Sequence, residues 1–371
     1  MIRSWPLLLL LAPTVARADE DGDESKLPPL SVYGFARLDV LADDAKLSDV
    51  AQPRFVQMMP TGTSNEGEMT MTPRLSRVGL SIDDWDVGDT SFIKGDGKLE
   101  VDFGGGGGTN AIRLRQAYAQ ISFDNKVRLL AGQTEDLFSP LIPTAQNDTQ
   151  LMFAGNVGDR RPQLRMVIDG AILHAGVALA TTGTLDRSGL MAATPSRPMF
   201  QWLIEGQKRF RHAGLLKVGI SGHLAREELA DGTRHGSSSV GIHAFLPIVP
   251  MIAFQGEAYV GANAADIGGG IDQGVDAMTG HRIGAKGGWI ELVAAPTKRH
   301  ILAFGTSLDT ANAGDLNPGD RERNGTVYAV VRYKPLPTLQ LAAEYLYWKT
   351  AYHDMGSATA NRYDMHLSVF F

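Results

Sequence analysis

The sequence predicts an all-β protein: a transmembrane antiparallel β-barrel of about 16 strands, with a long third loop folded into its lumen. Three observations lead to this prediction. Segments of strand length, in which apolar and polar side chains alternate, follow one another from Ser31 to the end of the chain. The connections between these segments alternate between short and long. A secretory signal precedes the first segment, which places the protein outside the cytoplasm.

Composition limits the classes of protein that need to be considered. The chain has 371 residues, of which 43% are hydrophobic, so it can bury the core of one large domain or two ordinary ones. It contains no cysteine. This excludes disulfide frameworks, thiolate metal sites and cysteine nucleophiles.

Residues 1–18 have the features of a signal peptide. Arg3 supplies the positive charge, residues 7–12 form a short apolar run, and residues 16–18 (ARA) form a small-x-small cleavage site. The apolar run is far shorter than the roughly 20 residues of a membrane-spanning helix. Removing the peptide takes away two arginines and no acidic residue, so the formal net charge changes from −6 to −8. An acidic chain argues against a nucleic-acid partner.

Residues 19–30 (DEDGDESKLPPL) form an acidic segment that is poor in apolar residues and ends in two prolines and a leucine. Such a composition is typical of a solvated lead, here a periplasmic one. Asp19, Asp21 and Asp23 surround Gly22 in a pattern that faintly resembles a calcium loop. The bidentate glutamate that closes such a loop is missing, so we prefer the solvated lead.

Residues 31–371 are expected to form the barrel. Their alternation predicts strands, and no helix, over these segments: 31–42, 74–84, 91–103, 111–123, 126–134, 162–169, 171–181, 199–210, 214–226, 237–246, 250–262, 282–294, 299–308, 325–334, 338–349 and 361–371. The lengths lie near the 9 to 11 residues that a tilted membrane strand needs.

Long and short connections lie at opposite ends of the predicted strands. The long ones are residues 42–73, 104–110, 135–161, 181–198, 227–235, 261–281, 309–324 and 350–361. They alternate with short turns if both chain ends lie on the turn side, as in outer-membrane barrels with short periplasmic turns and longer outer loops. A soluble β-sandwich has no reason to sort its connections in this way.

The third predicted strand shows why the inside of the barrel must be wet. Its charged residues share one parity: Lys94, Asp96, Lys98, Glu100 and Asp102. The opposite parity carries Ile93, Leu99, Val101 and Phe103. Unpaired charges cost several kcal/mol each to bury in a dry core, whereas a water-filled lumen accepts them.

One predicted strand breaks the alternation. Gln116, Gln120 and Ser122 share the parity of Ile112 and Leu114. Either a β-bulge near Gln116 exchanges the two faces, or these polar residues lie in an interface between subunits.

Several motifs resemble those of Gram-negative outer-membrane porins, and within them the DcaP-like porin family. They are residues 72–77 (TPRLSR), 98–108 (KLEVDFGGGGG), 112–118 (IRLRQAY) and 129–134 (LLAGQT), together with the terminal Phe371 after alternating apolar residues. The resemblance implies a homotrimer of sixteen-stranded barrels in the outer membrane, in contact with its lipid. It also implies passage of small anions such as dicarboxylates, and recognition of Phe371 by the outer-membrane assembly machinery.

Two features depart from that family. The N-terminal coiled coil of some DcaP-like proteins is not found in this sequence, and Glu135 stands where an aromatic residue often follows the AGQT motif. The phosphate- and polyphosphate-selective porins share the GQ-plus-loop layout and are the alternative family. A structural or adhesive barrel that conducts nothing is the alternative class, since long outer loops suit it equally well.

Selectivity of such a channel must come from side chains in the lumen and from any loop that narrows it. Strand parity places these basic residues on the lumen wall: Arg37, Arg77, Lys94, Lys98, Arg113, Arg115, Arg128 and Arg165. Our hypothesis is that Arg113, Arg115, Arg128 and Arg165 form a basic ladder. The acidic residues of the third loop, residues 135–161, would face it: Glu135, Asp136 and Asp148.

A basic ladder facing acidic groups would orient dipolar solutes and bind carboxylates or phosphates through guanidinium. We therefore expect a preference for anions. The alternative is that the wall charges only solvate the lumen or pair with one another, and for Arg37 with Asp39 and Lys94 with Asp96 the two interpretations remain equally open.

No constellation of residues indicates an enzyme. The histidines are scattered over different strands, and nothing places an acid beside Ser221 and His223 as a catalytic triad requires. The glycine run 104–108 follows a strand and precedes another strand, whereas phosphate-binding glycines open a helix. We expect neither a cofactor nor a metal.

Overall fold

The computed structural model describes residues 28–60, 62–88, 91–105, 111–146, 149–182, 194–195, 197–228, 232–276 and 278–371. The predicted signal peptide lies outside these residues, as does the predicted lead up to residue 27. Asp148 of the predicted ladder site also lies outside them.

Within the described residues, eighteen strands form a single sheet. They are β1 (Leu30–Asp43), β2 (Glu68–Thr72), β3 (Arg77–Asp86), β4 (Ile93–Gly105), β5 (Ala111–Phe123), β6 (Val127–Glu135), β7 (Arg160–Asp169), β8 (Leu173–Ala180), β9 (Thr194–Pro195), β10 (Met199–Phe210), β11 (Gly214–Glu228), β12 (Arg234–Val249), β13 (Ile252–Ala262), β14 (Gly284–Thr297), β15 (His300–Ala311), β16 (Arg321–Leu336), β17 (Leu339–Tyr352) and β18 (Gly356–Phe370). Two 3-10 helices, η1 (Ala265–Ile267) and η2 (Ala313–Asp315), lie in loops. Among the described residues, no helix is long and apolar enough to cross a membrane.

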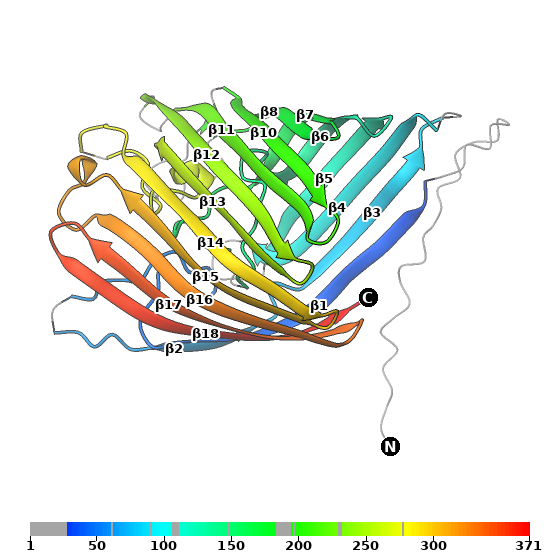
Figure 1. Cartoon of the computed structure of the whole chain (residues 1–371). Coiled ribbons are helices and arrows are strands. Elements are labelled where there is room, and N and C mark those ends of the chain that lie inside the picture. Colours follow the sequence, from blue (N-terminus) through cyan, green and yellow to red (C-terminus); the bar gives the residue numbers. More distant parts are fainter. Residues whose placement is uncertain are drawn as a thin grey trace, which may run out of the picture.

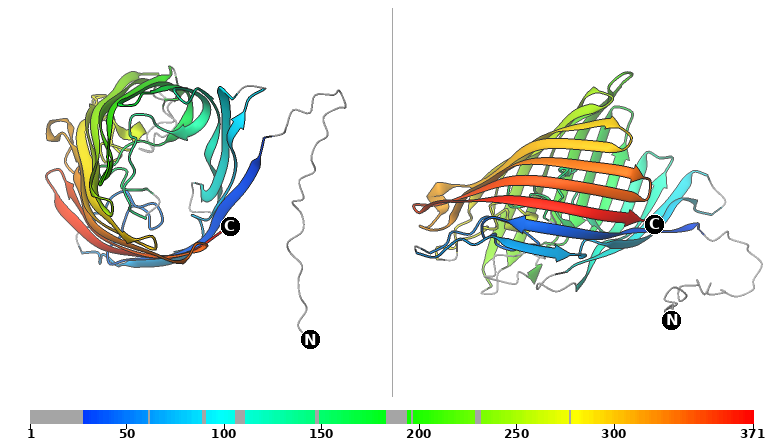
Figure 2. Two further views of the ribbon diagram at one scale, coloured as in Figure 1. Left: turned by 45° about the vertical axis from the view of Figure 1, so that its right-hand side comes forward. Right: turned by 90° about the horizontal axis from the view of Figure 1, so that it is seen from below.

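The sheet closes on itself because β1 pairs with β18 (Figures 1 and 2). β2 and β3 both pair with β1, at its end and its start, so they act as one strand that is interrupted before Arg77. Pro73, which has no N–H to donate, lies in this interruption. β9 is a two-residue addition beside β11. The ring is therefore an antiparallel barrel of 16 strands, which confirms the predicted fold class.

Each predicted strand segment coincides with an observed strand. The largest differences are at β16 and β18, which begin at Arg321 and Gly356 and not at residues 325 and 361. The added residues, 321–324 (RERN) and 356–360 (GSATA), carry none of the large apolar side chains that mark the lipid-facing part of a strand. The described chain begins and ends on the turn side: Leu30 pairs with Ile82 near the β3–β4 turn, and the amide of Phe370 donates to the carbonyl of Thr338 in the β16–β17 turn, at 2.8 Å.

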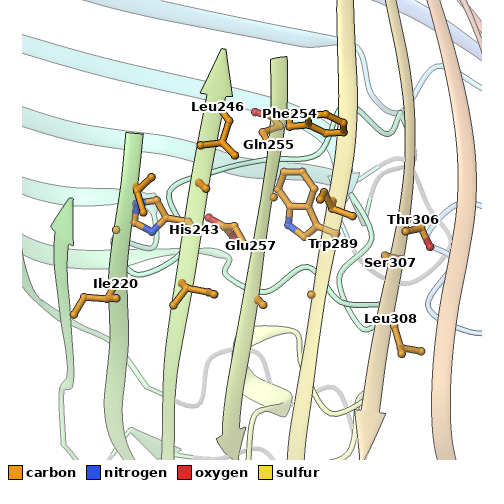
Figure 3. Close-up of a pocket in the computed structure, with 18 of the residues that line it drawn as sticks. Ile220, His243, Leu246, Phe254, Gln255, Glu257, Trp289, Thr306, Ser307 and Leu308 are labelled. Atoms are coloured by element: carbon orange, nitrogen blue, oxygen red, sulfur yellow. The ribbon is translucent and has the colours of Figure 1, made fainter. Parts of the chain in front are cut away.

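Side chains alternate between the two faces of the barrel, as β17 illustrates. Leu341, Tyr345 and Tyr347 point outward and are exposed, whereas Glu344 and Trp348 point into the lumen and are buried. The outer surface is thus apolar and suits hydrocarbon. A hollow of about 920 Å³ in this outer surface, over β10 to β15, is lined by apolar side chains such as Phe254 (Figure 3).

The irregularity in β5 is a β-bulge, the first of the two predicted explanations. The pairing of β4 with β5 slips between Glu100 opposite Gln116 and Val101 opposite Leu114, which leaves Arg115 as the extra residue. Beyond this point, the parity that faced outward at the start of β5 faces the lumen, and the other parity faces outward. Gln116 and Ser122 therefore face the lumen and are buried, although Ile112 on the same parity is exposed.

The lumen is not polar throughout. Buried apolar residues of β15 to β18 form a cluster with residues of the first loop (residues 44–67) and the third loop (residues 136–159). Trp348 lies in this cluster with Leu47 and Val56, and its indole nitrogen donates to Asn324 Oδ1 at 2.7 Å. Two loops are therefore folded inward and packed against the wall, and segments of chain are seen inside the ring in Figure 2.

Replacing the buried indole should loosen this packing. We expect Trp348→Ala to lower the stability of the folded barrel by about 3–5 kcal/mol, because it leaves a cavity and removes one of the two hydrogen bonds that Asn324 Oδ1 accepts. Tyr347→Ala, at the neighbouring outward position, is the control and should have a smaller effect. The measurement is the urea concentration at the midpoint of unfolding, and the folded fraction is determined from the migration of unheated samples on gels. Equal midpoints for the two variants would contradict the prediction.

Candidate functional site: the lumen constriction

Acidic side chains of the barrel wall hold the main chain of the third loop. Leu141 N donates to Glu257 of β13 at 2.7 Å, and Gln146 N donates to Glu344 of β17 at 2.6 Å. Between them, Glu291 of β14 accepts bonds from Thr144 N at 3.0 Å and from its hydroxyl at 2.7 Å. Buried amides need such partners, so these three glutamates fix the path of the loop along one wall.

The root of the loop is fixed by a buried ion pair. Asp136 lies 2.8 Å from Arg161, and neither side chain is accessible to solvent. Gln201 Nε2 and the amide of Asp159 also donate to the Asp136 carboxylate, at 2.6 and 2.9 Å. Burial raises the pKa of Asp136, and the charge of Arg161 opposes this effect. Asp136 is thus a structural residue.

The far half of the loop contacts two other loops. Phe153 N donates to the carbonyl of Gly268 in the sixth loop (residues 263–283) at 2.6 Å. Thr149 Oγ1 donates to the carbonyl of Pro53 in the first loop at 2.8 Å. Gly155 has a φ of +118°, and a Cβ there would lie 2.3 Å from the carbonyl oxygen of Gly288 on β14. The first, third and sixth loops therefore meet inside the barrel, close against its backbone.

A basic cluster lies on the wall formed by β3, β4 and β5 and by the start of β7. Its members are Arg77, Lys98, Arg113, Arg115 and Arg160. Most of them share two carboxylates. Arg113 and Arg115 contact Asp102 at 2.7 and 2.9 Å, and Arg115 also contacts Glu100 at 3.1 Å.

Arg77 and Lys98 approach Glu100 at 3.3 and 3.6 Å. Arg160 lies 3.9 Å from Asp159 and is close enough to Arg113 and Arg115 to be repelled by them. Four cations thus share the two carboxylates of Glu100 and Asp102, and the cluster keeps an excess of positive charge.

Exposure separates the two signs of charge in this cluster. The side chains of Arg77, Lys98 and Arg113 are 27%, 33% and 22% exposed. Those of Glu100 and Asp102 are 4% and 0% exposed. A solute in the lumen therefore meets the cations, while the acids lie behind them.

The structure brings together only part of the predicted ladder. Arg113 and Arg115 belong to the basic cluster. Arg165 lies lower on the wall, where it donates to Gln163 Oε1 at 2.9 Å and to the carbonyl of Glu135. The placement of Arg128 in the ladder was wrong, because its guanidinium pairs with Asp169 at 2.6 Å, at the turn between β7 and β8.

The loop acids also differ from the hypothesis. Asp136 does not face the basic wall, because it is buried against Arg161. The carboxylate of Glu135 accepts hydrogen bonds from Gln116 Nε2 at 2.6 Å and from Thr134 Oγ1 at 3.0 Å. It therefore lies at the foot of the loop, on the side of the basic cluster.

The remaining predicted wall cations lie in three different places. Arg37 pairs with Asp39 and donates to the carbonyl of Gln146 at 3.1 Å, so it lies beside the third loop. Lys98 is in the basic cluster. Lys94 lies at the turn end of the barrel, where it contacts Asp86 at 2.7 Å, and Asp96 accepts a bond from Gln120 at 3.1 Å. Pairing of Lys94 with Asp96 was one of the two interpretations left open, and Lys94 pairs with Asp86 and Asp84.

Sequence reasoning missed two arginines that contribute to the constriction. Arg160 is the first residue of β7, where the alternation of faces no longer identifies its direction. Arg332 of β16 donates to the carbonyl of Thr144, and no sequence motif marks it. One signal could have placed Arg332 in the lumen: its neighbour Val331 is apolar and faces outward, so Arg332 must face inward.

No protein-family model matches the sequence, and no curated protein matches it. Solved structures do match. The outer membrane channel DcaP of Acinetobacter baumannii has a TM-score of 0.73 at 18% identity, over 92% of this chain and 97% of that chain. The anion-selective porin from Comamonas acidovorans has a TM-score of 0.61 at 13% identity, over 92% and 99%. OmpT of Vibrio cholerae, as a loop L8 deletion mutant, has a TM-score of 0.60 at 12% identity, over 92% and 99%.

These matches extend over nearly the whole length of both chains. At such low identities they establish the fold alone and assign no role to individual residues of the site. The predicted resemblance to the DcaP-like porins is confirmed at the level of the fold. The chain has the barrel fold of the outer-membrane porins.

Proposed function

We propose that the protein is an outer-membrane porin, a water-filled channel through which small hydrophilic solutes diffuse passively, with a preference for anions such as dicarboxylates. The observation that carries the anion preference is the exposure of Arg77, Lys98 and Arg113 over the buried Glu100 and Asp102. The barrel fold, the signal-peptide features of residues 1–18 and the apolar outer surface support the outer-membrane location.

Charge near the constriction should outweigh the acidic net charge of the chain. The field is strongest where walls are close and water is scarce, and charges farther than about 8 Å from the ion are largely screened at physiological salt. The wall acids opposite, Glu257, Glu291 and Glu344, are occupied by the amides of the third loop. This arrangement leaves the basic cluster as the charge that a passing solute meets.

Phosphate is the second candidate solute. Guanidinium groups bind phosphate and carboxylate with the same bidentate geometry, so the basic cluster suits either anion. We infer no catalysis: Ser221 donates to the carbonyl of Phe138, and both ring nitrogens of His223 contact serine hydroxyls. No acid orients this pair within the described residues.

Removing two cations of the cluster should weaken the anion preference. We expect Arg113→Gln with Arg115→Gln to lower the ratio of anion to cation permeability several-fold, since one unit charge near the path changes the energy of an ion by about 1 kcal/mol. Arg128→Gln, which removes an arginine at the turn end, is the matched control and should leave the ratio nearly unchanged. Reversal potentials in asymmetric potassium chloride measure the ratio, and competition by phthalate or phosphate compares the two solutes. A cation-selective wild-type channel would refute the proposal.

Releasing the third loop from the wall should widen and destabilise the constriction. Glu291 accepts bonds from Thr144, Gln255 and Tyr328, and Glu291→Gln removes the charge that strengthens them. We expect larger and noisier single-channel currents in planar bilayers. Glu205→Gln is the control, because Glu205 is a buried wall acid that pairs with His243 and Lys217 and not with the loop. Identical current traces for both variants would show that the loop is held by other contacts.

Trimer formation and recognition of Phe371 by the assembly machinery are parts of the same proposal. Phe371 exchanges two main-chain hydrogen bonds with Gly34, so the last residue closes the barrel beside the first strand. Deleting Phe371 should reduce the amount of heat-modifiable oligomer in outer-membrane fractions. Phe371→Tyr, which keeps the ring, should retain it. Unchanged amounts after the deletion would argue against a role in assembly.

A further inference from the structure

The seam between β1 and β18 is where the two ends of the barrel sheet meet. Asp39 pairs in register with His366, and Leu41 pairs with Asp364. β1 and β18 are the first and last strands of the ring, so no turn joins them. The seam is therefore held by the hydrogen bonds of its ladder and by side-chain contacts alone.

Three potential metal ligands meet on the lumen face of this seam. One ligand atom from each of Asp39, Asp364 and His366 lies within 4.8 Å of the others. The three residues are 1%, 1% and 5% exposed, so the group is buried. Ligands about 2.0–2.2 Å from a tetrahedral zinc ion lie roughly 3.4 Å apart, so an ion would draw these side chains together.

Two atoms of the group are buried without a hydrogen-bond partner: Asp364 Oδ1 and His366 Nδ1. The Nδ1 atom lies 4.0 Å from Asp39 Oδ1, too far for a hydrogen bond. Leaving polar atoms buried and unpaired costs about 1–3 kcal/mol each, and a charged group costs more. A ligand bound by both atoms would remove this cost.

The other nitrogen of His366 is already oriented by a second residue. Nε2 lies 3.1 Å from the amide nitrogen of Gln340 on β17, an orientation in which Gln340 donates and His366 Nδ1 carries the proton. Exchanging the nitrogen and oxygen of this amide, which are assigned from the hydrogen-bond network, makes Gln340 the acceptor of the Nε2 proton and leaves the lone pair of Nδ1 for a metal. Metal-ligating histidines are usually held in this way by an acceptor on the far side of the ring.

Charges around the group set its affinity. Arg37 binds Asp39, and Arg362 binds Asp43 of the same seam at 2.8 Å. Arg37 and Arg332 also act on His366. Arg37, Arg362, Asp43 and Glu344 act on Asp364. A metal ion must therefore share Asp39 with Arg37. One imidazole with two carboxylates suits a first-row divalent ion such as zinc better than calcium or magnesium.

We propose that Asp39, Asp364 and His366 form a divalent transition-metal site that cross-links the first and last strands of the barrel. The ion takes one ligand from β1 and two from β18. It joins the strands at a point where no covalent turn does.

Zinc binding to the purified full-length protein tests the site. The protein is prepared in detergent without a histidine tag, stripped with EDTA and titrated with zinc chloride by calorimetry. We expect one zinc ion per chain, a loss of at least tenfold in affinity for Asp364→Asn with His366→Gln, and weaker binding of calcium. His353→Gln is the matched control, because His353 also contacts two acids, Glu322 and Asp354, but lies in the eighth outer loop. It should bind zinc as the wild type does.

Thermal unfolding is a second test of the proposed metal cross-link. Zinc at 100 times its dissociation constant should raise the ratio of folded to unfolded protein about 100-fold, so the heat-modifiable band persists to higher temperature. The shift should occur in the wild type and in His353→Gln, and not in the double variant. The proposal is overturned if the wild type binds no zinc at one per chain, or if the double variant binds it equally. If the double variant fails to fold, His366→Gln decides, since it keeps both carboxylates: unchanged zinc affinity overturns the proposal.

Discussion

The narrowing of the lumen depends on one constraint: the main-chain amides of a loop inside a barrel have no neighbouring strand to pair with. The third loop leaves the ladder after Glu135, and its N–H groups at Leu141, Thr144 and Gln146 have no strand to pair with. Burying such an amide without a partner costs about 1–3 kcal/mol. Glu291 and Glu344 of the wall are buried as well and need donors in turn. The loop and that wall therefore satisfy each other, and the charge that remains exposed lies on the other side of the lumen.

The loop packing also changes the character of the lumen. Tyr328, Leu346 and Trp348 point inward, where a fully water-filled barrel would place polar groups. They are covered by Leu47, Val56 and other residues of the loops, so this part of the lumen is a hydrophobic core in the ordinary sense. The inner wall of this barrel thus has polar and apolar parts. The apolar part is the one that the inward-folded loops cover.

The strands could be predicted from the sequence because lipid and water impose opposite demands on alternate residues. For the same reason the break near Gln116 was visible in the sequence, although a bulge was only one of its two explanations, and the structure has the bulge at Arg115. The pairing of charges could not be predicted, because it depends on the tilt and stagger of the strands. Arg113 and Arg128 share the lumen face but lie at different heights, one beside Asp102 and the other beside Asp169. Glu135 and Asp136 are neighbours in sequence, yet only Asp136 meets Arg161.

The inward fold of the first loop bears on how a cell carrying this protein is recognised from outside. Val56 donates to Thr350 and accepts from Tyr352, and Leu47 and Val56 are almost completely buried, so the middle of the loop is sheltered by the last strands. Antibodies and bacteriophages bind what protrudes. The segments between β15 and β16 and between β17 and β18, where Asp354 and Met355 are exposed, offer such an epitope, whereas the middle of the first loop does not. Molecules that bind the cell from outside can therefore reach those outer segments but not the middle of the loop that packs inside.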